Sequence, residues 1–88
     1  MSKKFKLKKP KRYFYEVVRQ SLTTDELGTY VTYGIRVSTE RTQITFVSDI
    51  STDEHAVKHL AERCTREQLD PIHLNDVIED FLQEIPIT

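Results

Sequence analysis

The hydrophobic period of the sequence changes abruptly near residue 50, and this change restricts the possible folds more than any other feature. Before it, apolar residues recur at every second position, as in half-buried strands; after it they recur at helical spacing. At the boundary, the segment Ser51-Thr52-Asp53-Glu54 has the form of a capping box, in which Ser51 and Glu54 each accept from the other's backbone amide. The chain therefore divides into a strand-forming part followed by a helix-forming part.

Three segments of the first part are predicted to be strands, at residues 13–22, 29–38 and 43–50. The first is rich in aromatic and β-branched residues. The second alternates most clearly, with these apolar residues on one face: Val31, Tyr33, Ile35 and Val37. In the third, Ile44, Phe46 and Ile50 are in phase. Short polar connections, including a turn from Thr23 to Gly28, favour an antiparallel meander.

Two helices are predicted in the second part. The first ends near Glu67 or Gln68, and its apolar stripe contains Ala56, Val57, Leu60, Ala61 and Cys64. Asp70-Pro71 begins the second helix, because Asp is a good N-cap and Pro fits the first helical position. Its stripe runs to Ile85, and Pro86 ends it. The expected fold is α+β, a three-stranded antiparallel β-meander followed by two α-helices packed on one face (β-β-β-α-α).

Charge is distributed unevenly along the chain. Residues 1–12 carry about +7 and no acid, whereas the remaining residues carry about −8. The basic residues of the first segment are Lys3, Lys4, Lys6, Lys8, Lys9, Lys11 and Arg12. Phe5 and Leu7 alternate with these lysines, which would allow a short strand that orders on docking. We expect a flexible basic arm at residues 1–12 and a single domain at residues 13–88.

The single cysteine, Cys64, excludes an internal disulfide. The Lys-rich N-terminus is not followed by the apolar run of a secretory signal. No segment approaches the roughly 20 apolar residues that a membrane-spanning helix needs. These features predict a cytoplasmic protein without a transmembrane segment.

The order and spacing of several motifs resemble those of a known family. They are Tyr33-Gly34-Ile35, Asp49-Ile50-Ser51, and His73-Leu74 followed by Asp76-Val77-Ile78-Glu79-Asp80-Phe81-Leu82. The family consists of short bacterial proteins, mostly from Gram-positive anaerobes, and is classed as a domain of unknown function. The resemblance covers residues 13–85 and implies a compact bacterial domain, but it implies no activity, cofactor or functional residue.

The residues that could carry chemistry do not form a recognisable site. His55 and His59 have a spacing that can chelate a metal, but Cys64 lies on the opposite, apolar side of the helix, so we expect a solvated polar face. We expect Cys64 to be a buried hydrophobe and His73 to make helix-terminal hydrogen bonds. With only two glycines, the chain has no phosphate-binding loop. We therefore expect neither an enzyme nor a cofactor, metal or small-molecule substrate.

Two surfaces are candidates for binding a partner. The first strand is apolar on both faces, and the third adds Val47 to its polar side. The sequence does not indicate which face of the first strand packs on the helices, but the uncovered face would carry apolar surface, with Phe14, Val18 and Val47 as candidates for partner binding. A homodimer through that face or an edge-strand pairing would cover it, although scattered apolar surface residues are also normal. The second candidate is the acidic side of the last helix, with Asp76, Glu79 and Asp80.

These observations predict a small non-enzymatic protein-interaction or regulatory module that binds another protein or itself as a homodimer. The alternative is an accessory nucleic-acid-binding protein that acts through its basic arm, because lysines near phosphates release counterions without reading sequence. The predicted helices lack a basic face, which argues against reading of a DNA groove.

Overall fold

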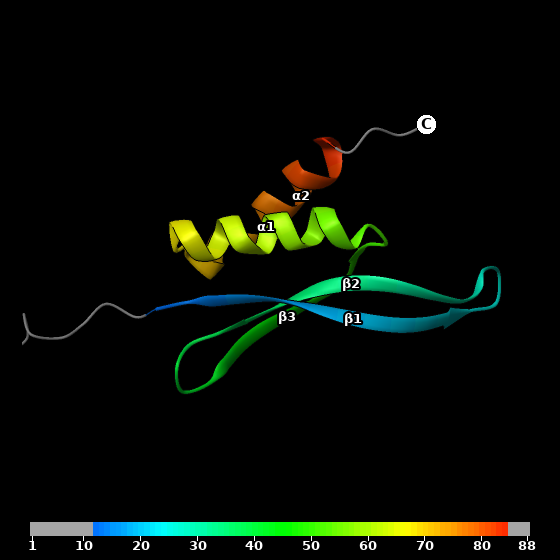
Figure 1. Ribbon diagram of the computed structural model, residues 1–88, viewed down its shortest axis with the longest axis horizontal. Coiled ribbons are helices and arrows are strands. Elements are labelled where there is room, and N and C mark those ends of the chain that lie inside the picture. Colours follow the sequence, from blue (N-terminus) through cyan, green and yellow to red (C-terminus); the bar gives the residue numbers. More distant parts are fainter. Residues whose placement is uncertain (1–11, 85–88) are drawn as a thin grey trace, which may run out of the picture.

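Three strands and two helices make up the computed structural model, which describes residues 12–84. They follow the predicted order: β1 (Phe14–Thr24), β2 (Gly28–Ser38), β3 (Gln43–Ser51), α1 (Glu54–Glu67), a 3-10 turn η2 (Pro71–His73) and α2 (Leu74–Glu84). Both helices lie on the same side of the sheet (Figure 1). The predicted α+β fold is therefore confirmed. The C-terminal end of the predicted second helix lies outside the described residues.

The sheet is an antiparallel meander with the strand order β1-β2-β3. Phe14 pairs with Ser38 and Thr24 with Gly28, so β1 and β2 form a long hairpin. Its tip is a three-residue loop that ends at Gly28, whose φ of 70° is readily adopted only by glycine. The hairpin extends well beyond α1, so only the part of the sheet near the chain's N-terminal end is covered by helices (Figure 1).

Strand β3 contains a register irregularity, and because of it some of its side chains lie on the opposite side of the sheet from the one predicted. Ile35 pairs with Val47 while Tyr33 pairs with Ser51, so extra residues are accommodated between them, and Asp49 adopts a φ of 56°. Consequently Val47 packs against the core together with buried Ile50, whereas Phe46 is exposed. The prediction that Ile44, Phe46 and Ile50 share one face was wrong, because a bulge breaks the period of two.

The core lies between α1 and the part of the sheet that α1 covers. Its fully buried side chains include Ile35, Val37 and Val57. On the opposite face of β2, Gly34 has no side chain because a Cβ there would clash with the carbonyl oxygen of Val47. The space above it is crossed by the side chain of Gln20, whose amide oxygen and nitrogen bond to Asp49 N and Ser48 Oγ.

The first helix begins two residues later than a Ser51 cap would place it. Asp53 is the N-cap, and its carboxylate accepts a hydrogen bond from the amide of Ala56 at 3.1 Å. Ser51 Oγ instead accepts from the amide of Asp53. The predicted Ser51–Glu54 capping box was therefore wrong, since Ser51 remains the last residue of β3 and pairs with Tyr33.

The end of the first helix and the start of the second lie where the sequence predicts them. Helix α1 ends at Glu67, and Gln68 takes a left-handed conformation with φ 52°. Asp70 caps the next turn through a hydrogen bond from the amide of Ile72, and Pro71 is its first residue. Helix α2 then buries Leu74 and Ile78 against the core. Neither helix is long and apolar enough to cross a membrane, within the part of the chain that the structure describes.

Candidate strand-addition site at the edge of β1

The outer edge of β1 is covered by α1 along its first residues. Gln68 Oε1 accepts from the amide of Tyr13 at 2.9 Å, and Gln68 Nε2 donates to the carbonyl of the same residue. Thr65 Oγ1 accepts from the amide of Tyr15 at 3.1 Å and donates to its carbonyl. These two side chains therefore satisfy the backbone groups that point away from β2.

The same edge is open further along the strand. In an antiparallel pair, alternate residues turn their N–H and C=O groups toward and away from the partner strand. The backbone N–H and C=O groups of Tyr13 and Tyr15 point away from β2. By the same alternation, the backbone groups of Val17, Arg19 and Ser21 also point away from β2. Within residues 12–84, no side chain makes an equivalent bond to the backbone of these three residues. We call the outward backbone groups of Val17, Arg19 and Ser21 the free edge.

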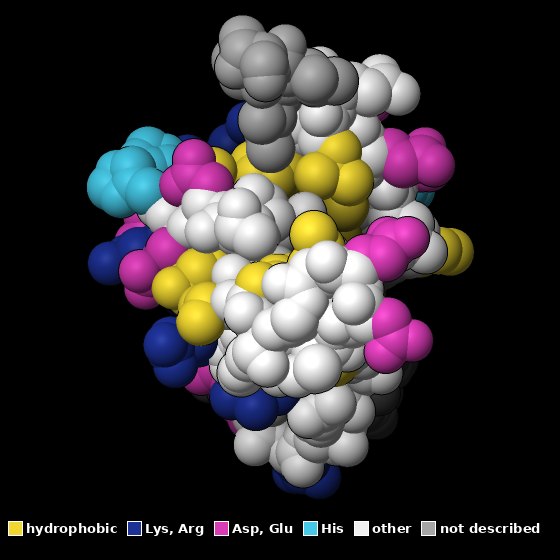
Figure 2. Space-filling view, turned by 90° about the vertical axis from the view of Figure 1, so that its right-hand side faces the viewer, with side chains coloured by type: hydrophobic (Ala, Val, Ile, Leu, Met, Phe, Trp, Pro, Cys, Tyr) yellow, Lys and Arg dark blue, Asp and Glu magenta, His cyan; other side chains and the backbone are white. Residues whose placement is uncertain are grey.

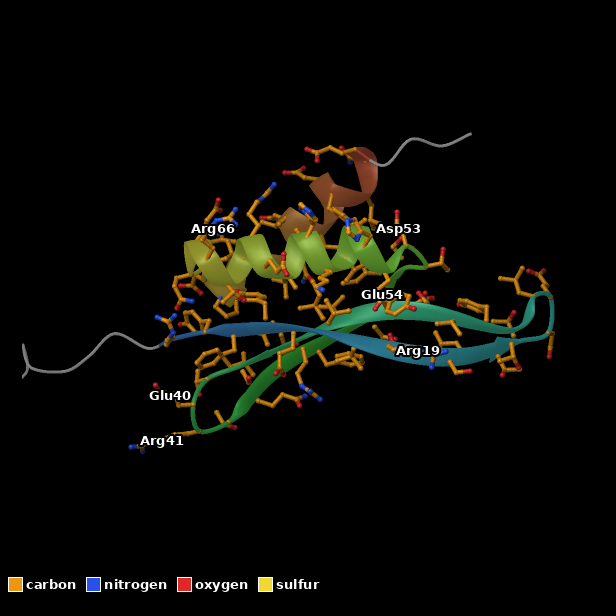
Figure 3. All side chains as sticks on the ribbon, in the orientation of Figure 1. Arg19, Glu40, Arg41, Asp53, Glu54 and Arg66 are labelled. Atoms are coloured by element: carbon orange, nitrogen blue, oxygen red, sulfur yellow. The ribbon has the colours of Figure 1, made fainter. Side chains whose placement is uncertain are left out.

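A hollow of about 410 Å³ lies beside the free edge, between β1 and the part of α1 from Glu54 to Glu62. Its apolar lining consists of Tyr15, Val17, Tyr33 and Ala61. Its charged lining consists of Glu16, Arg19, Glu54, Lys58 and Glu62. Glu54 lies at the end of α1 that is above Arg19 (Figure 3). We call this space the edge hollow.

Apolar side chains also reach the surface elsewhere between the two layers. Viewed from the hairpin tip, hydrophobic atoms are visible between the helices and the sheet, with acidic and basic side chains around them (Figure 2). Ile72 and Ile44, 78% and 42% exposed, border a smaller hollow of about 280 Å³ beside β3. This hollow offers no charged side chain to orient a ligand, whereas the edge hollow combines apolar contact, charge and unpaired backbone.

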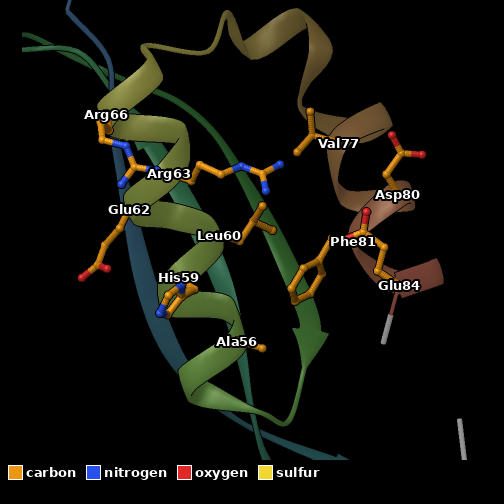
Figure 4. A pocket seen from close by; sticks show the side chains of 10 residues that line it. All are labelled: Ala56, His59, Leu60, Glu62, Arg63, Arg66, Val77, Asp80, Phe81 and Glu84. Atoms are coloured by element: carbon orange, nitrogen blue, oxygen red, sulfur yellow. The ribbon is translucent and has the colours of Figure 1, made fainter. Parts of the chain in front are cut away.

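A separate hollow of about 430 Å³ lies between α1 and α2. Arg63 extends from α1 toward α2, while Asp80 and Glu84 project from α2, and Leu60 and Phe81 form the apolar base (Figure 4). The arginine and the carboxylates make no ion pair within 4 Å among the described residues. This arrangement is an open charged groove, which His59 and Glu62 of α1 also line.

The sheet face away from the helices is less apolar than the sequence predicts. Phe14 and Val18 lie on it and are half-buried, but Val47 does not, because the bulge turns it toward the core. The centre of the face is polar. Arg36 and Glu16 form an ion pair at 3.2 Å, and Asp49 accepts from the hydroxyls of Thr32 and Tyr30. The placement of Val47 in a partner-binding face was therefore wrong.

The titratable groups near the core are held in their neutral forms. Burial raises the pKa of Tyr15 above its ordinary value, helped by the nearby Cys64 and Asp70, and its hydroxyl donates to the carbonyl of Leu69 at 2.6 Å. Burial also raises the pKa of the Cys64 thiol, although Arg63 opposes the shift. Since a thiolate is the nucleophile, this site disfavours reaction at Cys64. The predicted burial of Cys64 is confirmed.

The other candidate residues are spread over the surface. The rings of His55 and His59 lie 5.5 Å apart on the exposed side of α1, and no group of three metal-ligating side chains forms within the described residues. The backbone N–H of His73 bonds to Asp70 O at the start of η2. Asp76, Glu79 and Asp80 are exposed on α2, where only Asp80 borders the groove. Of the predicted arm, only Arg12 lies inside the described residues, with its guanidinium 5.9 Å from the centre of the Phe14 ring.

Two residues that define the site were not predicted. Thr65 lies 50 residues from Tyr15 in sequence and Gln68 lies 55 residues from Tyr13, so these bonds depend on how α1 docks on the sheet. A polar Thr within the last turn of an amphipathic helix, on the side next to its apolar stripe, was the one available signal.

The fold and this edge define a small α+β domain in which a helix covers half of an edge strand and leaves the other half open. The chain belongs to a family of unknown function (DUF6514), whose model matches residues 2–84. The match extends over the basic segment that precedes β1. No curated protein and no solved structure matches the chain.

Proposed function

We propose that this protein is a protein-interaction module that binds an extended segment of a partner by strand addition at the free edge of β1. The observation that supports this most directly is the contrast along one edge: the outward groups of Tyr13 and Tyr15 are bonded to α1, and those of Val17, Arg19 and Ser21 are not. An exposed row of backbone donors and acceptors is a template for another strand.

The edge hollow gives such an interaction its specificity. In an added strand, every second side chain would point to the side of the sheet on which α1 lies. Those side chains would enter the hollow and contact Val17, Tyr33 and Ala61. The backbone would then provide affinity, and the hollow would select apolar residues at alternate positions.

The charge of the domain favours basic residues at the remaining positions. Residues 12–84 carry seven basic and fourteen acidic side chains, a balance of about −7. The remaining positions project to the face of the sheet away from α1, where the side chain of Glu16 pairs with Arg36. We therefore infer a partner segment in which apolar residues alternate with lysine or arginine. Such charges raise the rate of association more than the final affinity.

The test is binding of short synthetic peptides to the full chain, measured by fluorescence polarisation. Three peptide sets alternate leucine with lysine, with glutamate or with serine. We expect the lysine set to bind most tightly. Ser21→Pro removes an outward N–H on an exposed edge and should weaken binding about tenfold, whereas Ser21→Ala keeps the N–H and should not.

Two results would contradict the proposal. Equal binding by all three sets would show that the charge of the domain does not select basic residues in the ligand. Unchanged binding by Ser21→Pro would place the ligand elsewhere than the free edge. Sedimentation without peptide tests the alternative occupant, a second copy of the chain, because a dimer through the same edge would be lost in Ser21→Pro.

A further inference from the structure

The segment that precedes β1 has the properties that the free edge selects. Phe5 and Leu7 are its apolar residues, and they alternate with Lys4, Lys6 and Lys8. The described structure begins at Arg12, directly before β1, so this segment is tethered next to the site. We propose that residues 3–8 fold back along the free edge of the same chain as a fourth strand. This inference rests on the same site as the proposed function.

The register follows from which edge groups are already occupied. Tyr13 and Tyr15 are bonded to Gln68 and Thr65, so the returning segment pairs beyond them. Antiparallel pairing then places Leu7 opposite Val17, with Phe5 and Lys3 opposite the next two outward residues, Arg19 and Ser21. In this register each paired residue meets an outward-pointing N–H and C=O.

The connection is long enough for this register. From Tyr13 to Glu16 the strand advances about 10 Å, at roughly 3.3 Å per residue. The five links between Lys8 and Tyr13 span up to about 17 Å when extended. Pro10 lies within that connection and outside the paired segment, where its missing N–H removes no ladder hydrogen bond.

The same register directs each kind of side chain to a matching surface. Residues directly opposite each other in an antiparallel pair project to the same side of the sheet. Leu7 and Phe5 therefore project with Val17 and Arg19 toward the edge hollow. Lys8 lies opposite Glu16 on the other face, which adds a favourable cross-strand charge pair.

The fourth strand makes the module self-occupied. A partner segment has to displace residues 3–8. Its apparent association constant is therefore the intrinsic one multiplied by the fraction of molecules in which the edge is free. Because the segment is tethered, its effective concentration at the edge is in the millimolar range, typical of short linkers. Weakening the segment should therefore tighten binding of an external peptide.

Amide hydrogen exchange of the full chain, followed by NMR, tests the fold-back directly. The amides of Val17, Arg19 and Ser21 should exchange at least about tenfold more slowly in the unsubstituted chain than in Phe5→Ser/Leu7→Ser. The amides of Val18 and Gln20, which point to β2, should be equal in both and serve as the internal control. Lys4→Ser/Lys6→Ser changes the opposite side of the segment and should retain most of the protection.

Each alternative has a distinct result. Rapid exchange of all three amides in the unsubstituted chain overturns the fold-back, as does equal loss of protection in both double variants. If the protection of these amides from exchange increases with protein concentration, residues 3–8 of a second copy occupy the edge. That result overturns pairing within one chain. Unprotected amides together with salt-dependent binding to a DNA duplex, lost in Lys4→Ser/Lys6→Ser, would make the segment a nucleic-acid arm instead.

The peptide experiment separates this inference from the proposed function. Tighter binding of the lysine set by Phe5→Ser/Leu7→Ser than by the unsubstituted chain supports both. If the unsubstituted chain and Phe5→Ser/Leu7→Ser bind the peptide equally, and adding Ser21→Pro abolishes binding in both, the result supports the proposed interaction module and overturns the fold-back. Protected amides in a chain that binds no peptide set support the fold-back and overturn the module.

Discussion

The two halves of the β1–β2 hairpin have the same backbone pairing but very different surroundings. Near Tyr15 and Val37, α1 covers one face of the hairpin and also bonds to its outer edge through Thr65 and Gln68. Near Leu22 and Val31, the hairpin extends past the helix, and these two side chains are half-buried. One helix thus provides both the hydrophobic core and the protection of the edge, and beyond it the outward backbone groups of β1 have no side-chain partner among residues 12–84.

The largest expected difference is in core packing. Val37 is fully buried and Val31 is half-buried, and both are valines of β2 on the same side of the sheet. Val37→Ala should lower the free energy of unfolding by about 2 to 3 kcal/mol, since it removes two buried methyl groups and leaves a cavity. Val31→Ala should cost about 1 kcal/mol or less. Urea denaturation of the two variants measures the difference, and equal costs would show that the projecting half is packed as firmly as the covered half.

A smaller effect is expected from uncovering the edge. Thr65→Val keeps the shape of the side chain but removes the acceptor for the amide of Tyr15, so it should cost about 1 to 2 kcal/mol. The amide of Tyr15 should then exchange faster, while that of Val57 within α1 serves as a reference. If the exchange rate at Tyr15 does not change, the hydroxyl of Thr65 is not what protects this part of the edge.

The third expected effect is a dependence of stability on pH, which should differ between Tyr15 and Tyr30. Folding raises the pKa of Tyr15, so the folded chain keeps a proton that the unfolded chain loses above the ordinary tyrosine pKa. The contribution is fully present below that pKa, and stability should fall above about pH 10, by up to about 1.4 kcal/mol per pH unit for this group. Buried Cys64 acts in the same direction.

Urea denaturation between neutral and alkaline pH tests this slope. Tyr15→Phe should make the alkaline fall in stability shallower. Tyr30, whose pKa is raised by its hydrogen bond to Asp49, is half-buried on the projecting half, and Tyr30→Phe should preserve most of the fall. Equal slopes for the two variants would show that burial under α1 does not control the ionisation of Tyr15.

The candidate site could be predicted only in part. The apolar two-faced character of β1 and the alternation of Phe5 and Leu7 with lysines are visible in the sequence, and they point to edge pairing and a docking segment. The position of the free edge is not, because it depends on where α1 stops covering β1. The placement of Val47 failed for a related reason: a bulge of unknown position changes the facing of every residue on one side of it.

The sequence by itself determined the element order, the hairpin turn at Gly28 and the helix boundaries at Gln68 and Asp70, because local periodicity and backbone conformation decide these features. Tertiary structure alone decided which side of β3 faces the core and which capping residue starts α1. It also decided which backbone groups of β1 stay open, since the bonds of Thr65 and Gln68 join residues about 50 positions apart and form only when the helix docks.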